Sequence, residues 1–402
     1  AAGYSHELRC VSYSKANLRQ GSPMPIQFNA SPKHTLGVEI ELGVVDRDTL
    51  GLVPRAAGIL ENVPEHWSDC VKPEFMQGYL EFNTGVCNTV EDVRRDLSEK
   101  LEWGYEEAAK SNSTFLWSGT HPFSRWDQQQ LTPDDRYQWL MDTMQFVARR
   151  IVCFGLHVHV GIDSGDKAIQ MCDRMMRHLP VMLALSANSP MWNGHDTGLA
   201  SYRSKIMESL PTAGLPETMR NWSEYNWLVD HLQSTDFIHS SREIWWDVRP
   251  VARFGTVEIR IMDTPMTMRQ LLGLVAMVQC VTAGISGEID RGAYLTDCHP
   301  MIARQNKWHA VRYGLDATLV DPDTMLAASA RQMARRTLDL CRPLADHLGC
   351  ATELGYCEEI LQSGTGAQMQ RRILEKTNEP AEVVRSLLSA TGEPWQSDVA
   401  CE

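Results

Sequence analysis

The sequence lacks the short motifs that mark several large classes of enzyme. It contains no GxxxxGK[ST] loop, no GxGxxG fingerprint and no GxSxG elbow. These motifs hold phosphates in P-loop proteins, bind dinucleotides in Rossmann folds and present the serine of α/β-hydrolases. None of these three classes is therefore indicated, and the chemistry has to be sought in other residues.

Paired cysteine motifs are missing as well. The 11 cysteines are scattered and none forms a CxxC pair, which argues against a zinc ribbon and against a CxxC redox motif. An odd number of cysteines in a chain of this size is typical of reduced thiols in the cytoplasm. We therefore predict a cytoplasmic protein with several cysteines in its core, and a disulfide between some of them stays open.

Positive charge and long apolar runs are scarce. The 38 Lys and Arg against 51 Asp and Glu give a net charge of -13, which argues against general nucleic-acid binding. The most apolar stretch, residues 267–285, contains Arg269 and Gln270 and is typical of a buried core helix rather than a membrane span. The start of the sequence shows no secretory leader. We expect neither a nucleic acid nor a membrane as a partner.

One stretch, residues 249–265, organises the rest of the chain. Within it, apolar and polar side chains alternate with a period of two, which predicts a strand. Its apolar face carries Val257, Ile259 and Ile261, and its polar face carries Glu258 and Arg260. A solvated sheet face with an ion pair would give the same pattern, so this strand alone decides nothing.

Three more stretches repeat the design. Residues 35–44 place Glu39 and Glu41 on one face, residues 79–84 present Glu81, and residues 155–161 carry His157 and His159. Two glutamates side by side on a bare strand repel each other, and a cation between them would remove that penalty. We predict that the four strands form one antiparallel sheet with a core behind it and an active-site floor in front.

The order of predicted elements favours a single large domain. Residues 1–33 are polar and rich in Gly, Pro and Ser, which predicts a surface extension. Residues 34–390 contain no internal repeat and no linker, so we treat them as one domain, and residues 391–402 as a loose tail. Long helices are predicted at 90–112, 134–150 and 267–285, and mostly helical structure from 323 to 390.

Some stretches have two interpretations that the sequence leaves open. The basic residues Arg304, Lys307 and Arg312 stand close together in an acidic protein and form either a solvated helix face or a clamp for a polyphosphate. The polar loop at 191–216 is either functional or solvated. His121 either closes a turn or belongs to the site, and Trp245 and Trp246 favour the core over a substrate platform.

Six segments together resemble the glutamate–cysteine ligase family, and specifically its bacterial carboxylate–amine ligase branch. They are GVEIELGVV, LEFNTGVC, SGTHPF, GLHVHVGIDSGD, RPVARFGTVEIRIMDTP and NKWHAVRYGLDA, in that order along the chain. The resemblance implies an α+β fold in which a curved antiparallel sheet, similar to the catalytic domain of glutamine synthetase, carries helices on its back. The C-terminal part is expected to be helical.

The resemblance also implies a function and a set of ligands. Members of the family join a carboxylate to an amine at the expense of ATP, with Mg²⁺ ions bound in the trough of the sheet. The metal ligands that the resemblance implies are Glu39, Glu41, Glu81, His159 and Glu258. Because a histidine is unusual among ligands of a hard cation, Mn²⁺ stays open in place of Mg²⁺.

The expected reaction requires charge neutralisation around the polyphosphate, in-line positioning of the reactants and a way to remove the amine proton. A carboxylate, most simply the γ-carboxyl of glutamate, is phosphorylated to an acyl phosphate, and cysteine or another small amine displaces the phosphate. Arg249, Arg260, Lys307 and Arg312 are the candidates to hold ATP phosphates, and Arg260 matches a phosphate-contacting arginine of the family. Glu258 and Arg260 are the expected catalytic pair, with His157 as a candidate for the amine proton. His157 has an equally strong interpretation as a core residue.

Two other functions remain open from the residues alone. A His-x-His pair with nearby carboxylates also suits a Zn²⁺- or Mn²⁺-dependent amide hydrolase. An inactive relative of the ligases that acts as a binding protein is a third reading. The excess of acids over histidines and the presence of Arg260 favour the ligase. A homodimer is compatible with the sequence.

Overall fold

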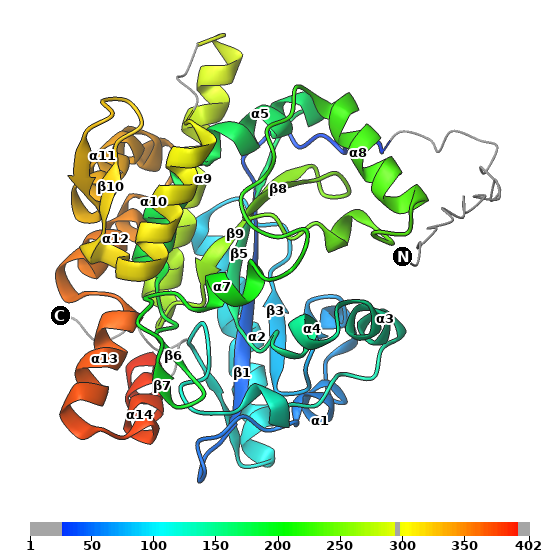
Figure 1. Ribbon diagram of the computed structural model, residues 1–402, viewed down its shortest axis with the longest axis vertical. Helices are drawn as coiled ribbons and strands as arrows, with labels where there is room; N and C mark the ends of the chain where they lie inside the picture. The colour runs from blue at the N-terminus through cyan, green and yellow to red at the C-terminus, as the bar shows by residue number, and fades with distance from the viewer. Residues whose placement is uncertain (1–25, 294–297, 393–402) are drawn as a thin grey trace, which may run out of the picture.

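The fold is built on one open antiparallel sheet that runs through the centre of the computed structural model, which describes residues 26–293 and 298–392 (Figure 1). In spatial order the strands are β2 (Val71–Pro73), β3 (Tyr79–Asn83), β1 (Leu36–Asp46), β5 (Gly155–Gly161), β9 (Thr256–Asp263) and β8 (Val248–Val251). Strand β4 (Ser113–Leu116) pairs with the far end of β1. The four predicted strands are therefore neighbours in one sheet, as expected.

The register of the strands decides which polar residues meet. Glu41 lies opposite Glu81 on β3, Glu39 lies opposite His157 on β5, and His159 lies opposite Glu258 on β9. Because side chains alternate between the two faces of a strand, these pairs share one face. The sheet thus gathers six of its acids and histidines from four strands on a single surface.

Helices flank the sheet on both sides, with α9 to α12 on one side and α3, α4 and α8 on the other (Figure 1). Their bounds are α1 Ala56–Leu60, α2 Val90–Lys110, α3 Asp135–Met144, α4 Phe146–Arg149, α5 Gly165–Met175, α6 Leu179–Ser186, α7 Arg203–Met207, α8 Trp222–Ser234, α9 Met268–Asp290, α10 Pro300–Tyr313, α11 Ala330–Leu348, α12 Ala351–Ser363, α13 Gly366–Thr377 and α14 Pro380–Thr391. The predicted helical C-terminal part is confirmed.

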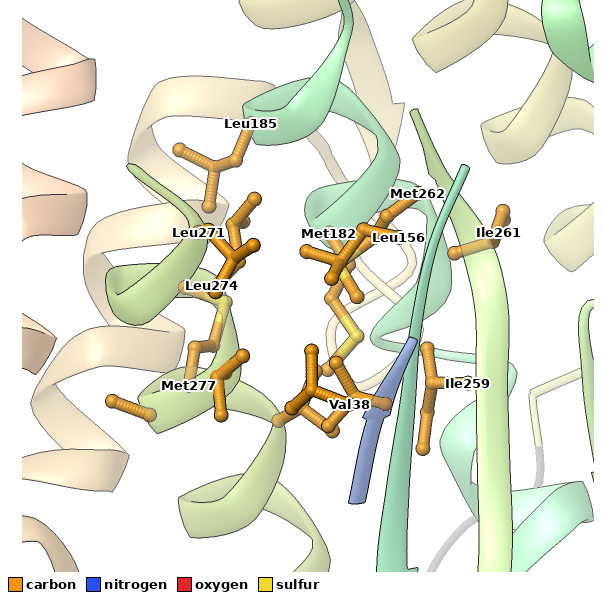
Figure 2. Close-up of a cluster of buried hydrophobic side chains, with 14 of the residues drawn as sticks. Val38, Leu156, Met182, Leu185, Ile259, Ile261, Met262, Leu271, Leu274 and Met277 are labelled. Carbon is orange, nitrogen blue, oxygen red and sulfur yellow. The ribbon is translucent and has the colours of Figure 1, made fainter. Parts of the chain in front are cut away.

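The back of the sheet packs on α6 and α9. Val38, Leu156 and Ile259 are fully or almost fully buried and belong to the same hydrophobic cluster as Leu274 and Met277 of α9 (Figure 2). Complete burial of a side chain of this size stabilises the fold by about 1.5–3 kcal/mol. This core fixes the back of the sheet and leaves its polar front free for other roles.

Helix α9 is the one described helix that is long and apolar enough to cross a membrane by length and composition alone. In this structure 72% of its most apolar window is buried, and its main packing partners are α12 and α11. It begins after Thr267, whose side chain accepts a hydrogen bond from the backbone N–H of Gln270. The prediction of a core helix at residues 267–285 agrees with this packing.

Local structure departs from the sequence prediction at two places. The helix expected over 134–150 is broken at Gln145, whose φ of 50° lies in the left-handed region and separates α3 from α4. The mostly helical structure expected from residue 323 begins only at Ala330, since β10 (Thr318–Val320) pairs with β11 (Ala327–Ser329) immediately before it.

The described part of the predicted N-terminal extension lies along the ends of β5 and β9. The backbone N–H of Asn29 donates to the carbonyl of Ala252, and that of Ser31 donates to the carbonyl of Ile162. The carbonyl of Asn29 comes so close to Gly255 that a Cβ there would lie 1.5 Å from it. Gly255 also has a φ of +65°, so two separate constraints require glycine at this turn.

Candidate functional site

A cavity of about 680 Å³ lies over the polar face of the sheet. Its floor is formed by β1, β3, β5, β8 and β9, and its walls by α3, α7 and the segment 240–245. Every metal ligand implied by the resemblance lines it, together with three of the other predicted site residues: Glu39, Glu41, Glu81, His159 and Glu258, with His157, Arg249 and Arg260.

One group of possible ligands joins the three central strands. Glu39, His157 and Glu258 each offer one atom, and these atoms lie within 4.8 Å of one another. The Nδ1 atom of His157 is 3.2 Å from Oε2 of Glu39 and 3.9 Å from Oε1 of Glu258. Two carboxylates and an imidazole at this separation can bind one divalent cation.

His159 completes this end of the cavity. Its Nε2 lies 3.3 Å from Oε1 of Glu39 and 3.8 Å from Oε1 of Glu258, yet it is buried and has no hydrogen-bond partner. Its Nδ1 lies 3.0 Å from the hydroxyl of Thr256, which orients the ring. A buried nitrogen without a partner between two carboxylates fits a ligand atom for a cation.

A second group lies beside the first. Glu41, Glu81 and His157 also bring ligand atoms within 4.8 Å of one another. His157 therefore belongs to both groups, and it is buried between them with 1% exposure. The sequence left His157 between a core role and a site role, and the structure brings it to the centre of the site.

Glu74 is a site residue that the sequence analysis missed. It lines the cavity in the short segment between β2 and β3. Burial and the nearby carboxylates of Glu81 and Glu41 raise its pKa well above the ordinary value. On one continuous strand over 74–84, Glu74 and Glu81 would point to opposite faces, and only the turn at residues 75–78 brings them together.

The carboxylates of the floor have unusual proton affinities. Burial, together with Glu39 and Glu41, raises the pKa of Glu81 to about 7. For Glu39 burial acts in the same direction, but His157 and His159 outweigh it and hold its pKa well below the ordinary value. This pattern reflects acids that are forced together in a site where water is scarce.

Two arginines hold Glu258 from opposite sides. Nε of Arg249 lies 2.6 Å from Oε2 of Glu258, and Nη1 of Arg260 contacts Oε1. Burial alone would raise the pKa of Glu258, but Arg249 and Arg260 outweigh it and keep the carboxyl ionised far into acid. The same guanidinium groups line the cavity and are placed to contact a bound anion.

Arg203, at the start of α7, is a further cation of the floor. It is 4% exposed, its Nη2 lies 3.3 Å from Nε2 of His157, and its Nη1 donates to the carbonyl of Arg260. Its Nε is buried and has no hydrogen-bond partner. The sequence marked the polar loop 191–216, which contains Arg203, as a candidate for function, but it assigned this residue no role.

Lys307 and Arg312, which the sequence placed among the phosphate contacts, do not line this cavity. Nζ of Lys307 lies 2.5 Å from Asp247 and 2.6 Å from Glu208, and the side chain is buried. Arg312 donates to the carbonyl of Gly198 and lies over the ring of Tyr313. A basic run on a helix does not reveal which acids of distant segments will neutralise it.

The three ambiguous residues can also be placed. Nδ1 of His121 accepts hydrogen bonds from the backbone N–H groups of Phe123 and Ser124, so this histidine closes a turn, which is one of its two interpretations. Trp246 is buried in a hydrophobic cluster, as expected. Trp245, by contrast, packs on a cluster and also lines the cavity.

The fold occurs in solved structures of enzymes. It is similar to a glutamate–cysteine ligase of Francisella tularensis determined in complex with AMP, with a TM-score of 0.67, 12% identity, and coverage of 90% of this chain and 89% of that one. A bifunctional glutathione synthetase of Pasteurella multocida matches with a TM-score of 0.65 and 13% identity over 88% of this chain and 52% of the other. At this level of identity the likeness establishes the fold alone.

The sequence comparisons establish the family in addition to the fold. A protein of Gloeobacter violaceus named "Putative glutamate--cysteine ligase 2" is 42% identical over 366 residues, which span 90% of this chain and 98% of that protein. A protein of the same name from Thermobifida fusca is 39% identical over 369 residues, 91% of this chain and 92% of that one. The family model of glutamate–cysteine ligase family 2 matches residues 35–390, so the chain belongs to that family.

Proposed function

We propose that this protein is an ATP-dependent carboxylate–amine ligase that forms an amide, most simply a γ-glutamyl amide, through an acyl phosphate. Membership of the glutamate–cysteine ligase family supports the reaction class. The observation that carries the proposal is that two groups of possible metal ligands and two arginines line the same cavity. Such a site matches the needs of polyphosphate chemistry better than those of a covalent nucleophile.

The residues of the floor fit Mg²⁺, or Mn²⁺ in its place. Glu39 and Glu258 with His159 would hold a cation at one end, and Glu41 and Glu81 would hold one at the other. When bound, such ions neutralise the charge of the ATP phosphates and of the transferred phosphoryl group. The unpartnered Nε2 of His159 and the opposed carboxylates of Glu41 and Glu81 are the features that favour this assignment.

Arginine side chains would position the anions. Arg249 and Arg260 present planar donors that match phosphate oxygens, and both share a single carboxylate, Glu258, so donor groups remain for a ligand. Arg203 offers a further buried guanidinium whose Nε has no partner. Together these groups can hold a phosphoryl group and a substrate carboxylate in line.

The proposed reaction has two steps. A carboxylate oxygen of the acid attacks the γ-phosphorus of ATP, the bond to the bridging oxygen breaks, and ADP leaves with that electron pair. The amine nitrogen then attacks the acyl carbon, phosphate leaves with the C–O electron pair, and the amine loses one proton. We assign His157 as the candidate acceptor because it lies between both groups of acids.

A metal-dependent amide hydrolase would use the same histidines and acids. Its site needs one water-activating cation and no arginine pair aimed at an anion. The engagement of Glu258 by both Arg249 and Arg260 therefore favours the ligase over the hydrolase.

Oxygen transfer tests the mechanism. The protein is incubated with ATP, Mg²⁺, an amine and glutamate labelled with ¹⁸O in its carboxyl groups, and the released phosphate is analysed by mass spectrometry. An acyl phosphate carries one labelled oxygen into phosphate. Amide formed with unlabelled phosphate would contradict the acyl phosphate, and AMP in place of ADP would indicate adenylation. Amide cleavage without nucleotide turnover would favour the hydrolase.

A further inference from the structure

An exposed aromatic ring stands at the edge of the cavity. Phe254 lies in the turn between β8 and β9, is 55% exposed, and lines the cavity. Single exposed apolar side chains are common on protein surfaces, so exposure alone assigns it no role. Of the large apolar side chains that are exposed in the described part of the chain, however, Phe254 is the one that borders this cavity.

The ring lies next to the first group of possible metal ligands. Its centroid is 5.9 Å from that of the His159 ring, in an edge-to-face arrangement. His159 in turn lies beside Glu258, with 3.8 Å between Nε2 and Oε1. Arg249 and Arg260 engage the same carboxylate. Phe254 therefore borders the end of the cavity that suits phosphate groups.

Backbone contacts hold the turn that carries the ring. The backbone N–H of Asn29 donates to the carbonyl of Ala252, and its side-chain amide donates to the carbonyl of Arg253 at 2.8 Å. Directly after the ring in sequence, the carbonyl of Gly255 accepts a hydrogen bond from the backbone N–H of Ile162. A ring that is presented on a fixed turn loses little conformational freedom when a ligand packs on it.

Two exposed arginines accompany the ring. The guanidinium carbon of Arg253 lies 5.5 Å from the centroid of the Phe254 ring. Arg242 lines the cavity from the segment 240–245 and, like Arg253, is exposed. Their positive charge raises the local concentration of anions. This edge of the cavity therefore suits a ligand that carries negative charge together with an apolar or aromatic surface.

A nucleotide combines these two properties in one molecule. Its phosphates would lie with the metal ligands and with Arg249 and Arg260, and its base is a planar aromatic ring at the opposite end of the molecule. Bases stack on exposed aromatic side chains because every base has a π-face, and a neighbouring arginine can add to the attraction. One nucleotide could thus contact the arginine pair and the Phe254 ring together.

A second aromatic surface borders the cavity and offers another place for a base. Tyr137 and Trp245 line the cavity and pack against one hydrophobic cluster. Both are half-buried, because part of each ring is covered by that cluster, whereas more than half of Phe254 is open to a ligand. The larger open surface and the contact with His159 favour Phe254.

We propose that Phe254 is the platform on which the nucleobase of ATP stacks. The inference rests on the proposed ligase function, from which the use of ATP is taken, and it adds the residue that binds the base. The turn between β8 and β9 is then the part of the site that distinguishes a nucleotide from other polyphosphates, while the sheet floor binds the phosphates of either kind.

Two ligands that share their phosphates but not the base test the proposal. Binding of ADP and of pyrophosphate, each with Mg²⁺, is measured by isothermal titration calorimetry. Phe254→Ala should weaken the binding of ADP about ten-fold, because a stacking contact is lost, and should leave the affinity for pyrophosphate within about two-fold of the wild type. Phe254→Trp keeps an aromatic face and should bind ADP as the wild type does.

Phe146→Ala is the matched control. Phe146 is 56% exposed, and the guanidinium carbon of Arg150 lies 5.4 Å from its ring centroid, so both its exposure and its neighbouring charge match those of Phe254. It lies on α4 and does not line the cavity, so its loss should leave the affinity for ADP unchanged. Equal affinities for ADP in Phe254→Ala and the wild type would overturn the inference.

Two other results would also contradict the base platform. An equal loss of affinity for ADP and pyrophosphate in Phe254→Ala would mean that the ring only supports His159 and the cation beside it. A larger loss of ADP affinity in Trp245→Ala than in Phe254→Ala would place the base on the second aromatic surface.

Turnover separates this inference from the ligase proposal. Binding of ADP that depends on Phe254, in a protein that forms no amide from any acid and amine pair, would support the base platform and contradict the ligase. Amide formation with an unchanged KM for ATP in Phe254→Ala would rule out the platform and leave the ligase standing. Failure of the wild type to bind ADP would likewise rule out the platform.

Discussion

Glu41 and Glu81 stand directly opposite each other on two neighbouring antiparallel strands, with both side chains on the buried front of the sheet. Like charges in this arrangement destabilise a sheet, and low exposure to water strengthens the repulsion. The pKa of Glu81, raised to about 7 by burial and by Glu39 and Glu41, reports this conflict. A cation that binds between the two carboxylates would offset this repulsion.

The pair leads to a prediction on cation binding. Glu81→Gln should lower the affinity for Mn²⁺, used as a spectroscopic probe, by about ten-fold or more, because an amide oxygen is a much weaker ligand than a carboxylate. Binding is followed by electron paramagnetic resonance on the metal-free protein. Removal of one of two repelling charges should at the same time leave the melting temperature equal or higher.

The control is Glu102→Gln, at an exposed position of α2. It removes the same charge from the protein but should leave Mn²⁺ affinity unchanged. Equal affinities of the Glu81 variant and the wild type would mean that no cation is held between β1 and β3.

Arg260→Lys should impair turnover more than folding. The arginine offers a planar set of donors that contact Glu258 and face the cavity, and lysine cannot reproduce this geometry at a phosphate. We expect kcat to fall at least about ten-fold, with a melting temperature close to that of the wild type because the positive charge beside Glu258 is retained. Normal turnover combined with a lower melting temperature would make Arg260 only a structural partner of Glu258.

The sequence predicted the sheet and its polar face because both follow from alternation along single strands. Strand β1 has Val38, Ile40 and Leu42 on one face and Glu39 and Glu41 on the other. Only the apolar face can pack on a core, so the alternation determines which way the glutamates point. That the four strands share one sheet could also be expected, since their hydrophobic backs and polar fronts match, but this matching does not determine their order.

Contacts between distant segments could not be predicted in this way. Glu74 joins the site through a turn at 75–78 that reverses its apparent face. Arg203 becomes a floor residue because Gly155 leaves room for it: a Cβ at this glycine would lie 2.1 Å from the guanidinium. Neither the turn geometry nor this close approach leaves a periodic signal in one sequence.

Lys307 was predicted to contact phosphate but does not line the cavity, and its surroundings lead to a prediction on stability. Its ammonium is buried between Asp247 and Glu208, and these acids outweigh the effect of burial and raise its pKa. Lys307→Met should lower the free energy of unfolding by about 3 kcal/mol, because two acids lose their partner. The KM for ATP of the folded fraction should stay unchanged. Chemical denaturation and steady-state kinetics measure the two quantities.

Arg304→Ala serves as the control for Lys307, because Arg304 is an exposed cation of the same helix. Its effect on stability should stay within about 0.5 kcal/mol. A large increase in the KM for ATP in the Lys307 variant, without loss of stability, would restore the phosphate-clamp interpretation of this stretch.

His121 makes the stability of the fold depend on pH. Burial lowers its pKa from 6.5 to about 4, while the unfolded chain keeps the ordinary value. Nδ1 accepts hydrogen bonds from two backbone N–H groups, so Nε2 carries the proton that it donates to the carbonyl of Leu50, and the ring is neutral. Between pH 4 and 6.5 the unfolded state binds more protons, so the free energy of unfolding rises with pH and is lost on acidification.

His121→Asn should remove this part of the pH dependence. The asparagine oxygen can take the place of Nδ1 as acceptor for Phe123 and Ser124, and it does not titrate. Between pH 7 and pH 5 the wild type should lose on the order of 2 kcal/mol more than the variant, as measured by urea unfolding at both values. His195→Asn, at an exposed position, should behave like the wild type. Equal losses in the His121 variant and the wild type would mean that this turn opens, and the ring becomes protonated, while the rest of the protein is still folded.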